Sequence, residues 1–147
     1  MAGIKDRSIG VILFYKFPRS LKYLILKHRK GHWSFAKGHP DKGETFRETA
    51  NRELHEEAGI REAEFVSKKV LIKESYNFFN NNKDKVSKTV SYFIAGSNTS
   101  KVKIDKKEII SYKWCTLKAG EKIITFSESR RVLRKADRIV LKYLSGK

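Results

Sequence analysis

The sequence has little cysteine, few acidic residues and no long apolar run. Cys115 is the single cysteine among 147 residues, so no disulfide can form within the chain, and a reducing compartment such as the cytoplasm is expected. No stretch approaches the roughly 20 apolar residues of a membrane-spanning helix, and residues 1–10 lack the apolar run of a signal peptide. We therefore expect a cytoplasmic protein in which Cys115 is buried in a strand.

The shortage of acidic residues makes the chain strongly basic. It has 16 Asp and Glu against 33 Lys and Arg, which gives a formal net charge of +17. Such a charge creates a positive potential that attracts polyanions, and nucleic acid, a polyphosphate substrate and an anionic membrane surface all qualify. Alternatively, a lysine-rich composition spreads charge over the whole surface without any specific partner. The net charge leaves these alternatives open.

What the chain does contain is enough apolar sequence for one domain with a core, since 39% of its residues are hydrophobic. Apolar and β-branched runs predict strands, and three- and four-residue spacing predicts a terminal helix that opens at a Thr125-x-x-Glu128 capping box. We expect a basic loop with exposed His28 and His32 and a polar loop over residues 75–87. The predicted strands cover residues 8–15, 21–27, 33–37, 63–72, 88–95 and 109–116.

The acidic residues are concentrated in one segment. Eight of the sixteen lie between Asp41 and Glu64. Within and just before this segment, Gly38 and Gly43 break regular structure. A capping box of Thr45 and Glu48 and a glycine stop at Gly59 predict a helix over residues 45–59.

The predicted helix has an apolar stripe beside an acidic arc. Glu53, Glu56 and Glu57 are neighbours on its surface, because residues three and four apart face the same way. One interpretation is a solvated charged face with the ion pairs Glu48–Arg52, Arg52–Glu56 and Glu57–Arg61. The other is a metal site, because the like charges at Glu53 and Glu57 repel each other and clustered carboxylates supply the oxygen ligands that magnesium and manganese prefer. The apolar stripe comprises Phe46, Ala50, Leu54 and Ala58.

Residues 38–60 resemble the signature of the Nudix hydrolases, G-x5-E-x7-R-E-U-x-E-E-x-G-U, where U is a bulky aliphatic residue. This resemblance implies a single domain over residues 1–147 with the α/β/α sandwich and mixed β-sheet of that family. It also implies metal-dependent hydrolysis of nucleoside polyphosphates. The fixed positions are filled by Gly38, Glu44, Arg52, Glu53, Leu54, Glu56, Glu57, Gly59 and Ile60.

The resemblance further implies residue roles. Glu53, Glu56 and Glu57 would hold magnesium, with manganese as a second candidate, and a backbone carbonyl of Lys37 or Gly38 would join them. Glu44 and Arg52 would brace the loop on the helix through a buried salt bridge. Glu108 is either the distant glutamate that completes such a site or a plain surface charge. The candidate catalytic residues are Glu56, Glu57 and Glu108.

The flanking sequence is similar to the asymmetrical diadenosine tetraphosphate hydrolases of this family. Residues 33–39 resemble their W-x-x-P-K-G-H segment, with Ala36 in place of proline, and residues 88–94 resemble K-x-V-x-Y-F-L. Glu108, six residues before Trp114, and then Phe126 resemble the family's late segment. This similarity implies cleavage of diadenosine tetraphosphate to ATP and AMP.

The candidate substrate-binding residues are basic or aromatic. Lys37, Lys88 and His39 offer positive charge or donors to phosphates, and Tyr76 and Phe126 could stack on adenine. By contrast, Tyr92, Phe93 and Trp114 are expected in the core.

Two alternatives to this function stay open. One is an RNA 5′-pyrophosphohydrolase, which the net charge would favour, and the other is a non-catalytic Nudix module that binds nucleotides or RNA. We expect a monomer whose partner is a nucleoside polyphosphate, with RNA as a second candidate and no membrane partner.

Overall fold

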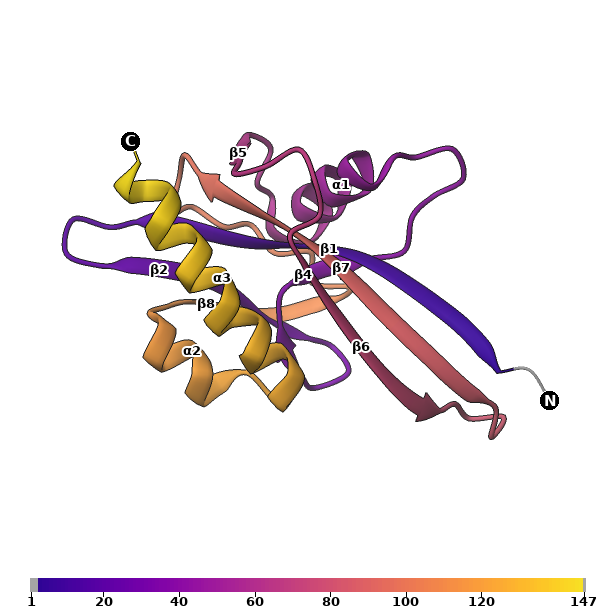
Figure 1. The fold of residues 1–147 in the computed structure, drawn as a ribbon. Coiled ribbons are helices and arrows are strands. Elements are labelled where there is room, and N and C mark those ends of the chain that lie inside the picture. The colour runs from indigo at the N-terminus through magenta and orange to yellow at the C-terminus, as the bar shows by residue number, and fades with distance from the viewer. Residues whose placement is uncertain (1–2, 147) are drawn as a thin grey trace.

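The computed structural model describes residues 3–146, and its strands form one mixed eight-stranded sheet (Figure 1). The strands are β1 (Ile4–Lys16), β2 (Leu21–His28), β3 (Trp33–Ser34), β4 (Ala36–Gly38), β5 (Ala63–Phe65), β6 (Ile72–Phe79), β7 (Lys85–Ser97) and β8 (Ile109–Cys115). The helices are α1 (Phe46–Ala58), α2 (Leu117–Ile123) and α3 (Ser127–Ser145).

β1 is the centre of the sheet. It runs parallel to β7 from the Ile4–Val86 pair to the Phe14–Gly96 pair, and antiparallel to β2 and β4. β7 in turn pairs with β5 and β6, while β2 pairs with β3 and β8. Residues 8–14 of β1 are all buried, as expected for a strand covered on both faces.

Helices cover both faces of the sheet. One apolar cluster contains Ile12, Tyr92 and Ile94 of the sheet with Leu133 and Val140 of α3. A second cluster, on the opposite face, packs strand residues against the apolar stripe of α1. Figure 1 shows α1 on one side and α2 and α3 on the other. The predicted α/β/α sandwich with a mixed sheet is therefore confirmed.

α1 begins and ends close to the predicted positions. The Thr45 side chain accepts from the backbone N–H of Glu48, whose carboxylate accepts in return from the Thr45 N–H. Gly59 has φ of 71°, and a Cβ at this position would lie 2.9 Å from the backbone oxygen of Lys103. Of the predicted stripe, Ala50, Leu54 and Ala58 are buried, whereas Phe46 is exposed in the first turn, where the Arg7 guanidinium lies over its ring.

The single strand predicted over residues 63–72 is wrong. β5 ends at Phe65 and β6 begins at Ile72. Between them the chain keeps two hydrogen bonds to β7, from Val66 N–H to the Ile94 carbonyl and from Leu71 N–H to the Tyr92 carbonyl. The polar residues 67–69 bulge outwards between these two bonds, which interrupts the strand.

The polar loop predicted over residues 75–87 is also wrong, because most of it is a β-hairpin. β6 continues to Phe79 and pairs with β7 from Lys85 onwards. The turn is closed by the Asn80 side chain, whose oxygen accepts from the N–H groups of Asn82 and Asp84. Residues 75–79 of β6 are exposed on both faces of the sheet, so pairing of the backbone with β7, rather than burial of alternate residues, forms this part of the strand.

Two features near the C-terminus differ from the sequence prediction. α2 was not predicted; Thr116 caps it by accepting from the Ala119 N–H. The predicted capping box at Thr125 is absent, because Phe126 occupies the N-cap position of α3 without a side-chain hydrogen bond. Thr125 instead accepts from the Trp33 N–H at 2.8 Å, so its hydroxyl connects α3 to β3.

The predicted core residues are largely confirmed. Tyr92, Phe93 and Cys115 are buried, whereas Trp114 is only partly buried and donates from its indole N–H to the Ser100 carbonyl. Within residues 3–146, no helix combines the length and apolar character needed to cross a membrane.

Candidate active site

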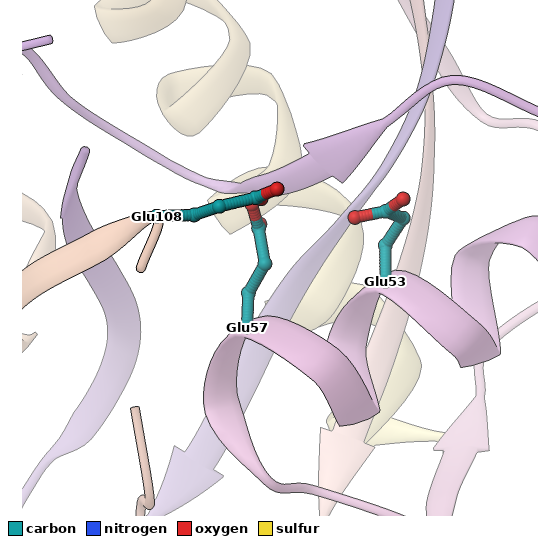
Figure 2. Close-up of side chains that lie close together, drawn as sticks. All are labelled: Glu53, Glu57 and Glu108. Atoms are coloured by element: carbon teal, nitrogen blue, oxygen red, sulfur yellow. The ribbon is translucent and has the colours of Figure 1, made fainter. Parts of the chain in front are cut away.

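α1 directs two glutamates towards the sheet, where a third joins them from a distant segment. Glu53 and Glu57 are 6% and 2% exposed, and Glu108 immediately precedes β8. One carboxylate oxygen from each lies within 4.8 Å of the others, and Figure 2 shows Glu108 reaching across to Glu57. Glu108 therefore belongs to this cluster and is not an isolated surface charge.

Glu56 lies apart from this three-carboxylate group. Its side chain is 51% exposed and accepts from Arg52 Nη1 at 3.3 Å, although Glu56 still lines the same cavity. Of the three ion pairs expected for a solvated helix face, only this one is present among the described residues. Glu48 is engaged in the capping box and Glu57 is buried, so neither reaches the arginine predicted for it.

The end of β4 lies against the glutamates. The Lys37 backbone N–H donates to Glu57 Oε1 at 3.0 Å. A Cβ on Gly38 would lie 2.1 Å from the carboxyl carbon of Glu53, so any other residue at this position would displace the Glu53 carboxylate. Glycine at this position therefore leaves room for the Glu53 carboxylate against β4.

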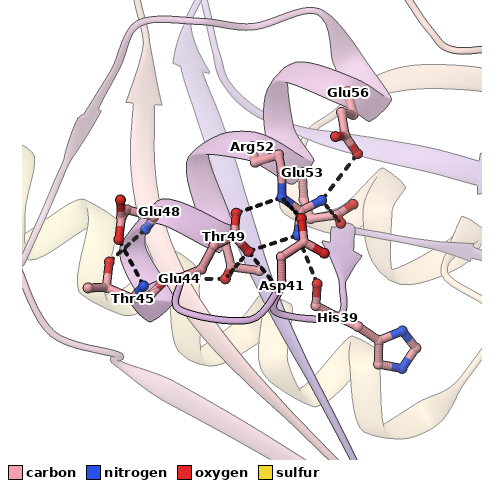
Figure 3. A network of polar contacts seen from close by, with 9 residues as sticks. All are labelled: His39, Asp41, Glu44, Thr45, Glu48, Thr49, Arg52, Glu53 and Glu56. Atoms are coloured by element: carbon pink, nitrogen blue, oxygen red, sulfur yellow. Dashed lines mark hydrogen bonds and ion pairs between the residues drawn. The ribbon is translucent and has the colours of Figure 1, made fainter.

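Arg52 braces the loop before α1 and orients Glu53 (Figure 3). Its guanidinium donates to both Glu44 oxygens, at 2.7 and 3.0 Å, to the His39 carbonyl at 2.8 Å and to Glu53 Oε1 at 2.8 Å. These bonds to Arg52 lower the pKa of Glu44 to about 2. The pair is only partly buried, with side-chain exposures of 24% and 18%, and it has the bracing geometry expected from the sequence.

The electrostatics of the cluster favour a bound cation. Burial, together with the charges of Glu53 and Glu108, raises the pKa of Glu57 to about 9, and burial with Glu56 and Glu108 raises that of Glu53. The site thus disfavours the ionised form of both carboxyls, and a bound cation would favour it. Oxygen donors at this spacing fit a hard divalent cation such as magnesium, which would offset the repulsion.

Arg29 holds the segment that carries Glu108. Its side chain donates from Nε to the Lys107 carbonyl at 2.9 Å and from Nη2 to the Lys106 carbonyl, and its backbone N–H donates to the Glu108 carbonyl at 2.7 Å. Sequence alone does not predict this role of Arg29, because Arg29 and Lys106 are 77 residues apart and no local pattern shows that this basic loop meets the start of β8.

A second cavity adjoins the carboxylates. It has a volume of about 630 Å³, against about 670 Å³ for the cavity that contains the glutamates, and the two share Lys37, His39 and Lys88 in their walls. Tyr76 and Phe126 line the second cavity and are 36% and 54% exposed. The predicted basic and aromatic residues therefore meet in one groove beside the acidic cluster.

The basic side chains of the groove are not equally available. Lys88 and His39 both contact Asp6, at 2.8 Å each. Burial lowers the pKa of Lys37, although the carboxylates of Glu74 and Glu57 oppose that shift. Lys37 is therefore a partly desolvated cation, which strengthens its attraction for a phosphate.

The histidines are placed differently from the prediction. His28 is buried at the end of β2, and its Nε2 lies 3.1 Å from the Phe35 carbonyl. Its ring stacks on His32 at 4.6 Å, and His32 contacts the Phe126 ring at 5.6 Å. Burial is the main cause that lowers both pKa values to about 4, so both rings are neutral at neutral pH, and His32 packs against Phe126.

Glu74 is a further residue of the groove that the sequence did not reveal. It is buried on β6 and accepts from the Tyr92 hydroxyl at 3.0 Å and from the Ser129 hydroxyl at 2.8 Å. These two bonds fasten the first turn of α3 to the sheet. Glu74 thereby fixes the helix start next to Phe126.

An α/β/α sandwich in which a glycine-containing loop leads into a helix with clustered glutamates is typical of one family of hydrolases. A comparison of the sequence with family models identifies the same family. Residues 5–136 match the family model described as NUDIX domain, so the chain belongs to the Nudix hydrolase family.

Individual relatives cover nearly the whole chain. The bis(5′-nucleosyl)-tetraphosphatase [asymmetrical] of Caenorhabditis elegans is 30% identical over 133 residues, which cover 88% of this chain and 92% of the relative. The protein of the same name from Rattus norvegicus is 31% identical over 137 residues, covering 87% and 90%. The crystal structure of a C. elegans Ap4A hydrolase binary complex superposes with a TM-score of 0.76 at 26% identity, covering 97% of this chain and 99% of that one.

Proposed function

We propose that this protein is a magnesium-dependent hydrolase that cleaves diadenosine tetraphosphate into ATP and AMP. The observation that carries this proposal is the direct connection between the carboxylate cluster and a groove lined by Lys37, Lys88, Tyr76 and Phe126. Relatives of about 30% identity that bear the name of this activity support it.

The metal site would be formed by Glu53, Glu56 and Glu57 with a backbone carbonyl of Lys37 or Gly38, and manganese could replace magnesium. When bound, the metal would neutralise charge on phosphate oxygens and lower the pKa of water at the site. Glu56, which lines the same cavity, would have to turn its exposed side chain away from Arg52 to join the other ligands.

The remaining groups would position the substrate. Lys37, Lys88 and His39 lie between the cluster and the aromatic residues, where the phosphate chain has to pass. Tyr76 and Phe126 would hold one adenine by stacking, which contributes about 1–3 kcal/mol per base. Holding the adenine and phosphates together decides which phosphorus lies beside the carboxylates.

Water would attack the phosphorus fourth from the held adenosine. The water oxygen forms a bond to that phosphorus while the bond from it to the bridging oxygen breaks, so ATP leaves and AMP keeps the new oxygen. The proton of the water would pass to one of the carboxylates of Glu56, Glu57 or Glu108.

Hydrolysis in ¹⁸O-labelled water, followed by mass spectrometry, tests this assignment. We expect ATP and AMP, with the label in AMP. Two molecules of ADP would contradict the regiochemistry, and label in ATP would place the attack on the other side of the broken bond.

An RNA 5′-pyrophosphohydrolase is a second candidate, because a net charge of +17 favours a larger polyanion. Release of pyrophosphate from 5′-triphosphate RNA, with diadenosine tetraphosphate left intact, would favour this alternative. Binding of both compounds without any product, in the presence of magnesium or manganese, would instead indicate a non-catalytic module.

A further inference from the structure

Three strands of the sheet continue beyond the helices. Figure 1 shows the start of β1, the start of β7 and the end of β6 extending together past α1 and α3. The register aligns Lys5 with Ser87 and Asn77, and Arg7 with Thr89 and Ser75. This projecting part of the sheet therefore has two faces whose side chains can be assigned row by row.

One of the two faces belongs to the groove already described. Asp6 and Lys88 are paired in the register and in an ion pair, and both line the groove with Tyr76 and Glu74. Because neighbouring residues along a strand point to opposite sides, Lys5, Arg7, Lys73 and Lys85 point to the other face.

Two contacts confirm the composition of that other face. The Arg7 guanidinium lies 5.4 Å from the centre of the Phe46 ring of α1, and the Ser87 hydroxyl donates to the Asn77 side chain at 2.9 Å. We call this surface the basic face. It comprises Lys5, Arg7, Lys73, Ser75, Asn77, Phe79, Lys85, Ser87 and Thr89.

The basic face has an unbalanced charge. Its four cations are exposed, and the acidic residues of the same strands, Asp6 and Glu74, point into the groove on the opposite side. Phe79 is 73% exposed, so an aromatic ring lies in solvent among basic, hydroxyl and amide side chains. A sheet face of this kind offers donors for phosphates and a ring on which a base can stack.

We propose that the basic face binds single-stranded nucleic acid. Lys5, Arg7, Lys73 and Lys85 would contact phosphates, and Phe79 would stack on a base. Unpaired bases suit this surface because they can be splayed onto an aromatic ring, which a duplex does not allow. An anionic membrane fits less well, since one ring among hydroxyl and amide groups offers little apolar surface for insertion. The face lies across the sheet from the groove, so this binding does not depend on the proposed hydrolysis.

The test uses a 12-nucleotide RNA with a 5′-hydroxyl and a 3′-fluorophore, which presents no 5′-phosphates to the groove. Binding of the full-length protein is followed by fluorescence anisotropy over a range of KCl concentrations. The test variant is Lys5→Gln/Lys73→Gln/Lys85→Gln. The matched control, Lys118→Gln/Lys122→Gln/Lys135→Gln, removes the same charge from exposed positions of α2 and α3.

We expect the test variant to lose at least about tenfold in affinity. Its plot of log K against log salt should become shallower by about 2, because each phosphate contact on a single strand contributes roughly 0.7 to the slope. The control variant should keep most of the affinity and most of the salt dependence. Phe79→Ala, which changes no charge, should weaken binding by about fivefold or more at an unchanged slope.

Equal losses in the test and control variants would overturn the proposal, because the charge would then act only as a diffuse field. Binding to phosphatidylserine vesicles without binding to the RNA would also overturn it and indicate a membrane surface. Hydrolysis of diadenosine tetraphosphate should be unchanged in the test variant and in Phe79→Ala. Unchanged hydrolysis shows that both variants are folded. If the wild-type protein itself does not hydrolyse the compound, the proposed enzymatic function is wrong, and the RNA-binding measurement still decides the present proposal.

Discussion

Glu57 combines burial, two carboxylate neighbours and a backbone donor from Lys37. Glu57→Gln can keep the hydrogen bond from the Lys37 N–H but removes the charge. We expect the rate of hydrolysis to fall by about 10²–10⁴-fold, the range for loss of a catalytic acid or base. Without metal, stability should hold or rise, because burial and the neighbouring carboxyls disfavour the charged form of Glu57 and glutamine removes that cost. Steady-state kinetics and thermal melts measure both effects.

Glu62→Gln is a suitable control, because this exposed glutamate lies outside both cavities of the candidate site. It should leave both the rate and the melting temperature unchanged. Normal turnover in magnesium by both Glu57→Gln and Glu56→Gln would disprove the metal-site assignment.

A substitution at Arg29 can show whether this residue acts by positioning the segment that carries Glu108 or only by its positive charge. Arg29→Lys retains the cation but loses the planar fork that reaches two carbonyls at once. We expect kcat to fall by about 10–100-fold, the usual effect of losing a residue that orients a group of a metal site, with little change in KM. Arg19→Lys, at an exposed position of the turn between β1 and β2 and outside both cavities, is the control. A change confined to KM would mean that Arg29 contacts substrate and does not position Glu108.

Single-residue prediction succeeded where spacing carries the information. The positions of Glu53, Glu57 and Arg52 follow from one helix and one glycine turn, so local sequence was sufficient to place them. Glu108 remained undecided because its approach to Glu57 depends on how β8 pairs with β2. His28 was misplaced for a related reason, since its burial comes from Phe35 and His32 after the chain has folded back.

At the scale of elements, β6 contributes Tyr76 to the groove and the N-cap of α3 contributes Phe126. We expect Tyr76→Ala and Phe126→Ala each to raise KM by about 5- to 150-fold, corresponding to about 1–3 kcal/mol of lost stacking. Both side chains are partly exposed, so the fold should be retained. Phe79→Ala is the control, because Phe79 is carried by the same strand but points to the basic face. Wild-type KM values in both groove variants would contradict the stacking role.

The sequence predicted long elements well and short or two-sided ones poorly. β1, β2, α1 and α3 have apolar patterns that come from burial against the sheet or a helix. β6 lacks such a pattern beyond Glu74, since residues 75–79 are exposed, and its polar composition is typical of a loop. α2 has only 7 residues, and such a helix is stabilised by its contacts with α3 more than by its own sequence.

At the scale of the whole molecule, the net charge of +17 surrounds a small acidic cluster. The field of such a charge extends about 30 Å at 0.01 M salt but only about 10 Å at 0.1 M. A polyphosphate should therefore be drawn towards the molecule from a distance, while the carboxylates act only after it arrives. The rate of substrate association and the rate of hydrolysis of bound substrate should therefore respond differently to salt.

We expect kcat/KM for diadenosine tetraphosphate to fall by about tenfold or more as KCl rises from about 0.01 to 0.3 M, because electrostatic steering of association weakens steeply with ionic strength. Once substrate is bound, the partly buried cluster is screened much less, so kcat should change by less than about twofold. Initial rates at saturating magnesium and at each salt concentration measure both constants. Parallel losses in kcat and kcat/KM would mean that salt disturbs the metal site itself, and a flat kcat/KM would mean that the net charge does not guide the substrate.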